Sequence, residues 1–163
     1  MTRALSMLPP EIDWRFTVVG EGPEEATLKR LAAALGIEGR VAFAGRLGRE
    51  EAISEMARHD AFVMPSSGET FGLAYLEAMA QGRIAVGTAG EGIDGVIEDG
   101  ANGFLVRPDA ESLRAALTRI ARMAPAERAA IGRVARATAK AMSAENMARA
   151  YLENAASAAG IRA

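Results

Sequence analysis

The sequence predicts a Rossmann-like α/β domain, with a doubly wound, mostly parallel sheet followed by Ala- and Arg-rich C-terminal helices. Short apolar runs alternate with segments of helical period, which is typical of βαβ units. The chain has 163 residues, of which 50% are hydrophobic and 25% charged. This length and composition suit one globular domain, so we expect residues 1–163 to form a single domain.

The expected elements follow one another in chain order. Apolar runs of four or five residues predict strands at 15–19, 40–44, 61–64, 84–87 and 103–106. Helical periodicity predicts connecting helices at 24–35, 49–59 and 71–81, and a short helix at 93–98. After Pro108, apolar residues at helical spacing predict two or three further helices that are separated near Pro125 and Ser143. Asp109 and Ser143 are the expected N-caps.

Composition excludes several classes of site and partner. The chain has no cysteine, which excludes disulfides and thiolate chemistry and favours a cytoplasmic location. A net charge of −2 gives no indication of nucleic-acid binding. Arg128, Arg136 and Lys140 share one predicted helix face. A solvated face is the simpler interpretation, and peripheral contact with an anionic membrane surface is the alternative.

Residues 65–82, PSSGETFGLAYLEAMAQG, place a polar loop directly before a helix. If that helix begins near Thr70, Glu69 and Glu77 lie about two turns apart on nearly one side. Backbone N–H groups from Gly68 to Gly72, together with the helix dipole, suit a phosphate, and two carboxylates could hold hydroxyls. A ligand with both features is a sugar nucleotide. As an isolated pair, the two glutamates could instead be ordinary helix charges.

Four segments follow one another between Trp14 and Val106: FTVVGEGP at 16–23, VAFAG at 41–45, the E-x7-E stretch at 65–82, and GEGIDGVIEDGANGFLV at 90–106. In this order they resemble the C-terminal, donor-binding half of the family 4 type retaining glycosyltransferases, which have the GT-B fold. The chain departs from the family at Gly95, where relatives commonly have a glutamate.

The resemblance implies binding of a nucleotide-diphosphate sugar for hexose transfer, without a metal or another cofactor. It assigns Glu69 a catalytic role at the hydroxyls of the transferred sugar, and it assigns Glu77 to the ribose. Gly45 and Arg46 would border the base, although Arg46 is equally consistent with a plain surface arginine. The other implied donor-binding residues lie in the loop and act mainly through backbone N–H groups: Ser67, Gly68, Thr70, Phe71, Gly72 and Leu73.

Gly20-Glu21-Gly22 follows a predicted strand but is not a dinucleotide-binding fingerprint, because the third glycine position is Glu25 and Pro23 lies in the turn. Two interpretations remain open for this segment. It is a tight strand-to-helix turn, or a turn that also borders the donor.

The resemblance begins after the family's first strand, which carries a basic diphosphate-binding segment, and the acceptor domain has no counterpart. We therefore expect weak donor binding and little or no turnover by the chain alone, with the acceptor half or a separate subunit as partner. The first strand is central in a doubly wound sheet. Another segment would fill its place, or the open strands would pair with each other or support self-association. The competing hypothesis is a non-catalytic module that binds a nucleotide or phosphosugar.

Overall fold

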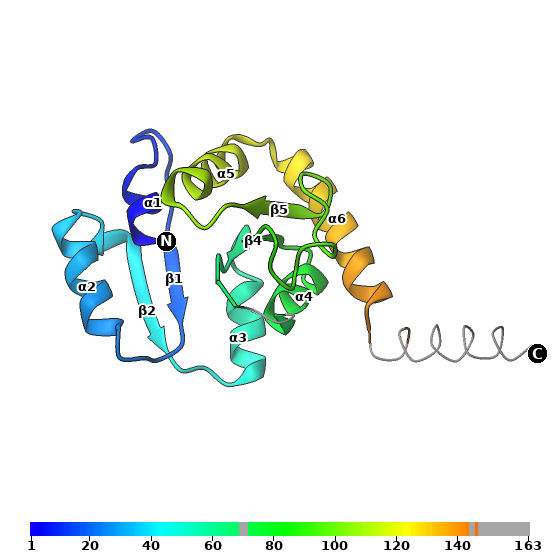
Figure 1. Cartoon of the computed structure of the whole chain (residues 1–163), viewed down its shortest axis with the longest axis horizontal. Helices are drawn as coiled ribbons and strands as arrows, with labels where there is room; N and C mark the ends of the chain where they lie inside the picture. Colours follow the sequence, from blue (N-terminus) through cyan, green and yellow to red (C-terminus); the bar gives the residue numbers. More distant parts are fainter. Residues whose placement is uncertain (69–71, 144–145, 147–163) are drawn as a thin grey trace, which may run out of the picture.

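The computed structural model describes residues 1–68, 72–143 and 146, and these residues form alternating strands and helices (Figure 1). In chain order the elements are α1 (Thr2–Ser6), β1 (Phe16–Val19), α2 (Glu25–Ala34), the 3-10 helix η1 (Glu38–Arg40), β2 (Val41–Gly45), α3 (Arg49–Met56), β3 (Ala61–Val63), α4 (Leu73–Ala80), β4 (Ile84–Thr88), β5 (Gly103–Val106), α5 (Ala110–Arg122) and α6 (Pro125–Ala141). The predicted α/β class is confirmed.

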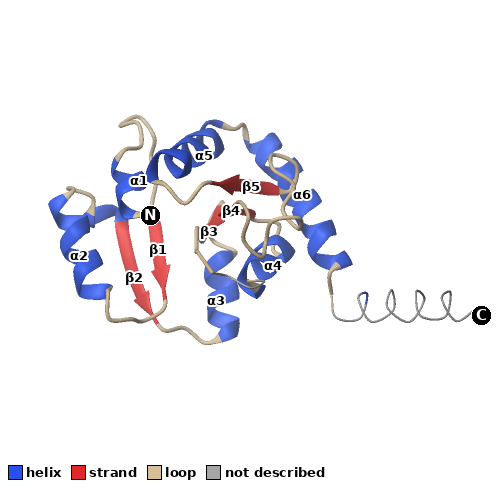
Figure 2. Ribbon diagram, viewed as in Figure 1, coloured by secondary structure: helices blue, strands red, loops and turns tan. Residues whose placement is uncertain are grey.

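The strands pair in parallel, but in two separate sets (Figure 2). One set contains β1 and β2, and the other has the order β3-β4-β5. β1 does not pair with β3. Each of these two strands therefore has one edge without a strand partner.

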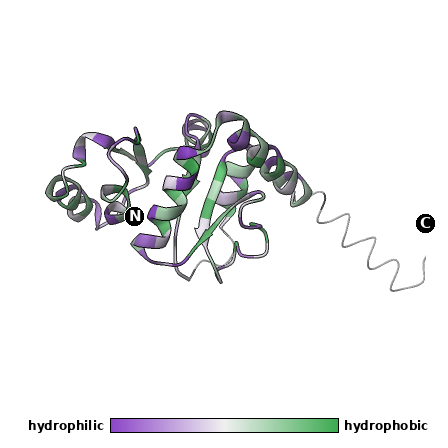
Figure 3. Ribbon diagram, turned by 90° about the horizontal axis from the view of Figure 1, so that it is seen from above, coloured by the Kyte–Doolittle hydropathy of each residue, from purple (hydrophilic) through white to green (hydrophobic). Residues whose placement is uncertain are grey.

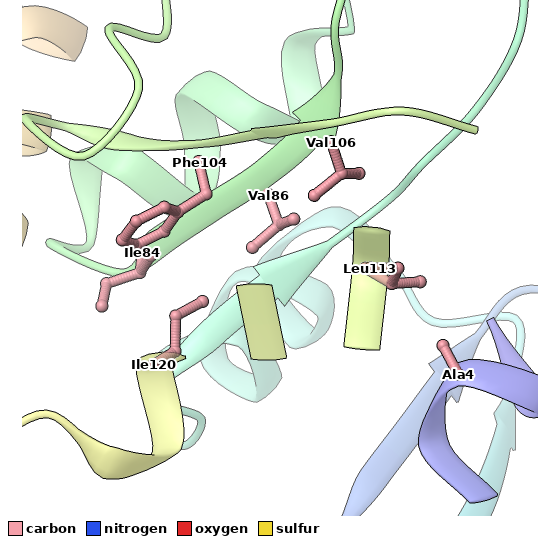
Figure 4. Packing of buried hydrophobic residues seen from close by; sticks show 7 residues of the cluster. All are labelled: Ala4, Ile84, Val86, Phe104, Val106, Leu113 and Ile120. Atoms are coloured by element: carbon pink, nitrogen blue, oxygen red, sulfur yellow. The ribbon is translucent and has the colours of Figure 1, made fainter. Parts of the chain in front are cut away.

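Helices cover both faces of the β3–β5 sheet. Successive side chains of a strand point to opposite faces, and accordingly Ile84 and Val86 of β4 pack with α5 and α1 while Ala85 packs with α4 and α6. Figure 4 shows the first cluster, where Ile84 and Val86 lie among Phe104, Leu113 and other apolar side chains. In Figure 3 the hydrophobic colour runs along the strands inside the helix layers. The sheet is doubly wound, as predicted.

The predicted helix at 93–98 is wrong. This segment forms turns with one isolated parallel bridge between Asp94 and Ile97. Gly95 has φ of 89°, a left-handed conformation that interrupts a right-handed helix. The Asp94 carboxylate also accepts a hydrogen bond from Gly90 N–H at 2.6 Å, which stabilises the turn instead.

The C-terminal helices begin where capping chemistry predicts. Asp109 caps α5, as predicted, and Pro125 is the first residue of α6. Ser143 Oγ accepts a hydrogen bond from Asn146 N–H at 3.3 Å, but the expected last helix lies mostly outside the described residues. Within the described part of the chain, no helix is long and apolar enough to cross a membrane.

The predicted basic face of α6 makes contacts within the chain. Arg128 donates to Met123 O at 2.8 Å and lies 3.5 Å from the Asp60 carboxylate. Arg136 donates to Gln81 O at 3.2 Å. These two cations tie α6 to neighbouring turns, so a membrane-facing role for this side stays a prediction that the contacts do not favour.

The Asp109 cap gives a pH-dependent prediction. Its carboxylate accepts a hydrogen bond from Ser112 N–H at 2.6 Å and another from Arg107 Nε at 3.1 Å, and both hold the pKa of Asp109 below its usual range. Because the folded-state pKa is depressed, the ionised Asp109 cap stabilises the fold above the unfolded-state pKa of about 4. This stabilisation is lost as the pH falls through the lower folded-state value.

Asp109→Ala should lower Tm by a few degrees at pH 7, as measured by circular dichroism. Asp109→Asn retains a side-chain oxygen for the cap and is the control, which should lie closer to wild type at pH 7. The difference between the Ala variant and wild type should shrink as the pH is taken below about 4. A difference that does not change with pH would contradict the role of the carboxylate.

Candidate functional site

The predicted site residues follow the carboxyl ends of the strands, which is the edge where doubly wound sheets bind ligands. Gly45 is the last residue of β2, and its carbonyl accepts a hydrogen bond from Gly20 N–H at 2.7 Å. The Gly20 turn and the predicted base-binding loop are therefore in direct contact. The turn is structural and also lies beside Gly45, so both interpretations of the Gly20–Gly22 segment remain compatible with its position. Arg46 is exposed beside it.

The loop after β3 is anchored by a buried tyrosine. Tyr75 of α4 is 1% exposed, and its hydroxyl donates to Met64 O at the end of β3. The same hydroxyl lies 3.4 Å from Ser66 Oγ, and the Tyr75 ring packs edge-on against Phe62, with ring centroids 5.6 Å apart. These contacts fix the start of the loop relative to the helix that follows it.

α4 begins at Leu73, later than the spacing argument assumed. Its N-cap is Gly72, which has the left-handed angles φ 70° and ψ 69°. A continuous helix therefore does not run from Thr70 to Glu77, and the two-turn estimate for Glu69 and Glu77 does not apply. Glu69, Thr70 and Phe71 lie outside the described residues, so their assigned roles stay predictions.

One loop amide already holds an anionic oxygen. Gly68 N–H donates to Glu91 Oε2 at 2.9 Å, and Glu91 comes from the loop after β4. Gly68 has φ of 74°, and Ser67 and Gly68 are both exposed. Sequence reasoning did not select Glu91. The nearest signal was its place in the segment 90–106, which matches the family resemblance.

Glu77 is paired with an arginine from another helix. Arg49 Nε donates to Glu77 Oε1 at 2.8 Å, and the two side chains are 78% and 25% exposed. Arg49 is the first residue of α3, so the pair joins the start of α3 to the middle of α4. The sequence carried no signal for Arg49, because the two residues lie 28 positions apart.

Leu73 completes the described part of the loop. This predicted donor-binding residue is 69% exposed, the most exposed of the large hydrophobic side chains described. Its side chain, in the first turn of α4, therefore lies open to solvent.

Comparison with known proteins decides the family. The family model described as group 1 glycosyl transferases matches residues 1–155. The chain belongs to this family. Among curated relatives, it is 39% identical over 106 residues to N-acetyl-alpha-D-glucosaminyl L-malate synthase of Bacillus anthracis, covering 64% of this chain and 27% of that protein. It is 38% identical over 121 residues to the lipopolysaccharide core biosynthesis glycosyltransferase LpsE of Rhizobium meliloti (strain 1021), covering 74% of this chain and 34% of that one.

Solved structures of other proteins superpose on most of the chain. HepE (Alr3699) of Anabaena, solved in complex with UDP and glucose, has a TM-score of 0.81 and 26% identity, covering 94% of this chain and 43% of that one. The C-terminal domain of LpcC from Francisella tularensis has a TM-score of 0.75 and 25% identity, covering 86% of this chain and 76% of that one. The chain thus has the Rossmann-like fold of a GT-B half and spans less than half the length of the curated relatives named here.

Proposed function

We propose that this chain is the donor-binding domain of a retaining glycosyltransferase and that it binds a nucleotide-diphosphate hexose at the carboxyl edge of its strands. The observation that carries the proposal is the Gly68 amide, which donates to a carboxylate oxygen at 2.9 Å. An N–H group in this position can donate equally to a phosphate oxygen. Family membership supports a nucleotide sugar as the source of that phosphate.

The proposed roles follow from the chemistry of each group. The N–H groups of the loop from Ser67 to Leu73 would stabilise negative charge as it develops on the departing diphosphate. Ionised Glu77 would accept hydrogen bonds from the ribose hydroxyls, and Glu69 from those of the transferred sugar. Gly45 and Arg46 would border the base. The acceptor would attack from the face that the leaving group vacates.

The carboxylates that now contact the site would have to rearrange. Arg49 neutralises Glu77 in the described conformation, and Glu91 occupies the Gly68 amide. A bound diphosphate would take the place of the Glu91 carboxylate, because two anions cannot share one amide donor without repulsion. Glu77 would exchange its exposed arginine for ribose hydroxyls, at low cost because exposed ion pairs contribute little.

A donor panel tests the proposal. The full chain is titrated by calorimetry with UDP, UDP-glucose, GDP-mannose and inorganic phosphate, and sugar release is followed in parallel. We expect a nucleoside diphosphate to bind at least tenfold more tightly than phosphate, since base and ribose contacts add to the loop contacts. Glu69→Gln should weaken binding of the sugar nucleotide but leave UDP binding unchanged.

Two results would change the proposal. Nucleotide binding that is insensitive to the sugar, with no sugar release when an acceptor domain of a relative is added, would favour the non-catalytic module. No binding of any nucleotide at millimolar concentration would reject donor binding by this chain.

A further inference from the structure

One carboxylate of this chain holds a backbone donor that the proposed ligand also needs. Gly68 N–H donates to Glu91 Oε2 at 2.9 Å, and the two residues lie 23 positions apart in the chain. Gly68 is exposed and Glu91 is partly buried. The contact therefore joins the loop after β3 to the loop after β4, and it is not a pair formed within one turn.

The backbone around Glu91 is fixed by its own turn. Glu91 N–H donates to Thr88 O at 3.3 Å, and Glu91 O accepts a hydrogen bond from Asp94 N–H at 2.8 Å. Gly90 has φ of 80°, and its N–H donates to the Asp94 carboxylate at 2.6 Å. Since Thr88 is the last residue of β4, these bonds give Glu91 a defined position relative to the sheet.

The two loops that meet in this contact are anchored on one buried cluster. Ile93 of the loop after β4 is 0% exposed. It packs with Tyr75 over Gly87 of β4, where a Cβ would lie 2.6 Å from Ile93 Cγ2 and 3.2 Å from Tyr75 Cε1. The Tyr75 hydroxyl donates to Met64 O, directly before the loop after β3. The core therefore sets the distance between the two loops.

We propose that Glu91 is a built-in competitor for the diphosphate. Its carboxylate holds the Gly68 amide in the empty site, and a phosphate oxygen can accept that hydrogen bond only after the carboxylate has left. The apparent affinity of any ligand that uses this amide is therefore reduced by the fraction of molecules in which the amide is free. The inference rests on the proposed function for the identity of the ligand.

The competition acts on substrate and product alike. The sugar-nucleotide donor and the nucleoside diphosphate that remains after transfer both carry the diphosphate, so Glu91 weakens both by one common factor. A nucleoside without phosphate does not use the amide and is not affected. The product thus leaves a site in which an anion of the protein is ready to take the amide back. Glu91 in this way limits inhibition by the product.

Calorimetric titration of the full chain tests the proposal. The ligands are UDP, GDP, inorganic phosphate, uridine and guanosine, at one pH and one ionic strength. Glu91→Gln should bind phosphate and the nucleoside diphosphate about five- to tenfold more tightly than wild type, because a neutral acceptor holds an amide less strongly than a charged one. Affinity for the nucleosides should stay within about twofold of wild type.

A second variant separates the contact from the charge. A carboxylate near a phosphate repels it even without a hydrogen bond to the loop. Glu91→Asp keeps the charge but shortens the side chain by one methylene, so it should still bind UDP about threefold or more tightly than wild type. Glu98→Gln removes an exposed charge from the same loop and is the matched control, with UDP affinity expected within about twofold of wild type.

Amide hydrogen exchange checks the contact in the absence of any ligand. Exchange of Gly68 N–H should be about fivefold or more faster in Glu91→Asp than in wild type, because the shorter carboxylate no longer holds it. Gly90 N–H, which donates to Asp94, is the internal reference and should exchange at the same rate in both proteins.

The results distinguish this inference from the proposed function. Equal UDP affinity in wild type and Glu91→Gln would overturn the competitor and leave donor binding intact. Tighter binding by Glu91→Gln but not by Glu91→Asp would assign the effect to charge alone, and an equal gain for uridine would exclude the phosphate as its cause. If no nucleotide binds but phosphate binds Glu91→Gln more tightly than wild type, the proposed function fails and the competitor stands.

Discussion

Replacing Glu77 with glutamine should weaken UDP binding by about tenfold to a hundredfold, because each hydrogen bond to a charged group is worth about 1.5–3 kcal/mol. The glutamine keeps the size of the side chain but replaces one of the two charged oxygens that would accept hydrogen bonds from the ribose hydroxyls by an NH₂ group. Calorimetric titration of UDP into the variant measures the change directly. The fold should survive, since Glu77 lies on a partly exposed side of α4.

Arg49→Ala is the matched control for Glu77→Gln. It removes the same ion pair while leaving the Glu77 carboxylate in place, and the pair is exposed enough to contribute about 0–1 kcal/mol to stability. UDP affinity should stay within about threefold of wild type or improve, because Arg49 no longer competes with the ribose hydroxyls for the Glu77 carboxylate. Equal losses in the two variants would mean that Glu77 serves only to pair with Arg49, contrary to the ribose assignment.

Gly132→Ala should destabilise the domain by about 3 kcal/mol, measured by urea unfolding, although alanine is normally the better helix residue by about 1 kcal/mol. Gly132 lies on α6 where the helix crosses the turn after α4. A Cβ at this position would lie 2.3 Å from the Gly82 carbonyl oxygen and 3.2 Å from its carbon. Both are backbone atoms, so the helix or the turn must move apart.

Gly39→Ala provides the control for this substitution. Gly39 lies in η1, and a Cβ there meets no atom within 4 Å. That variant should be stabilised by about 0.4–1 kcal/mol through the unfolded state. If Gly132→Ala matched or exceeded wild-type stability, the close approach of α6 to the Gly82 turn would be contradicted.

Local chemistry was sufficient to predict most of the fold. The strand predicted at 103–106 is β5 as observed, and the other four strands are displaced by one residue at one or both ends. Each is an apolar run of a length that suits a strand and is short for a helix, so the sequence leaves little alternative to a strand. The helix predicted at 93–98 failed because periodicity does not reveal that Gly95 adopts a left-handed backbone. The late start of α4 at Leu73 has the same cause at Gly72.

Less of the candidate site than of the fold could be predicted from the sequence. The positions of Gly45 and Ser67 at and after the carboxyl ends of β2 and β3 follow from where these strands end, which local patterns predict. The partners Arg49 and Glu91 do not, because each contact joins segments that are more than twenty residues apart. Such contacts depend on how packing of the core places α3 and the loop after β4, and residue spacing does not predict that placement.

The separate pairing of the strands has a thermodynamic consequence. Gly45 and Arg46 belong to the unit built on β1 and β2, while the Gly68 loop and Glu77 belong to the unit built on β3 to β5. A donor that touched both units would bind tightly only while the two units hold one mutual orientation. Its apparent affinity would therefore fall in proportion to the fraction of molecules that populate that orientation.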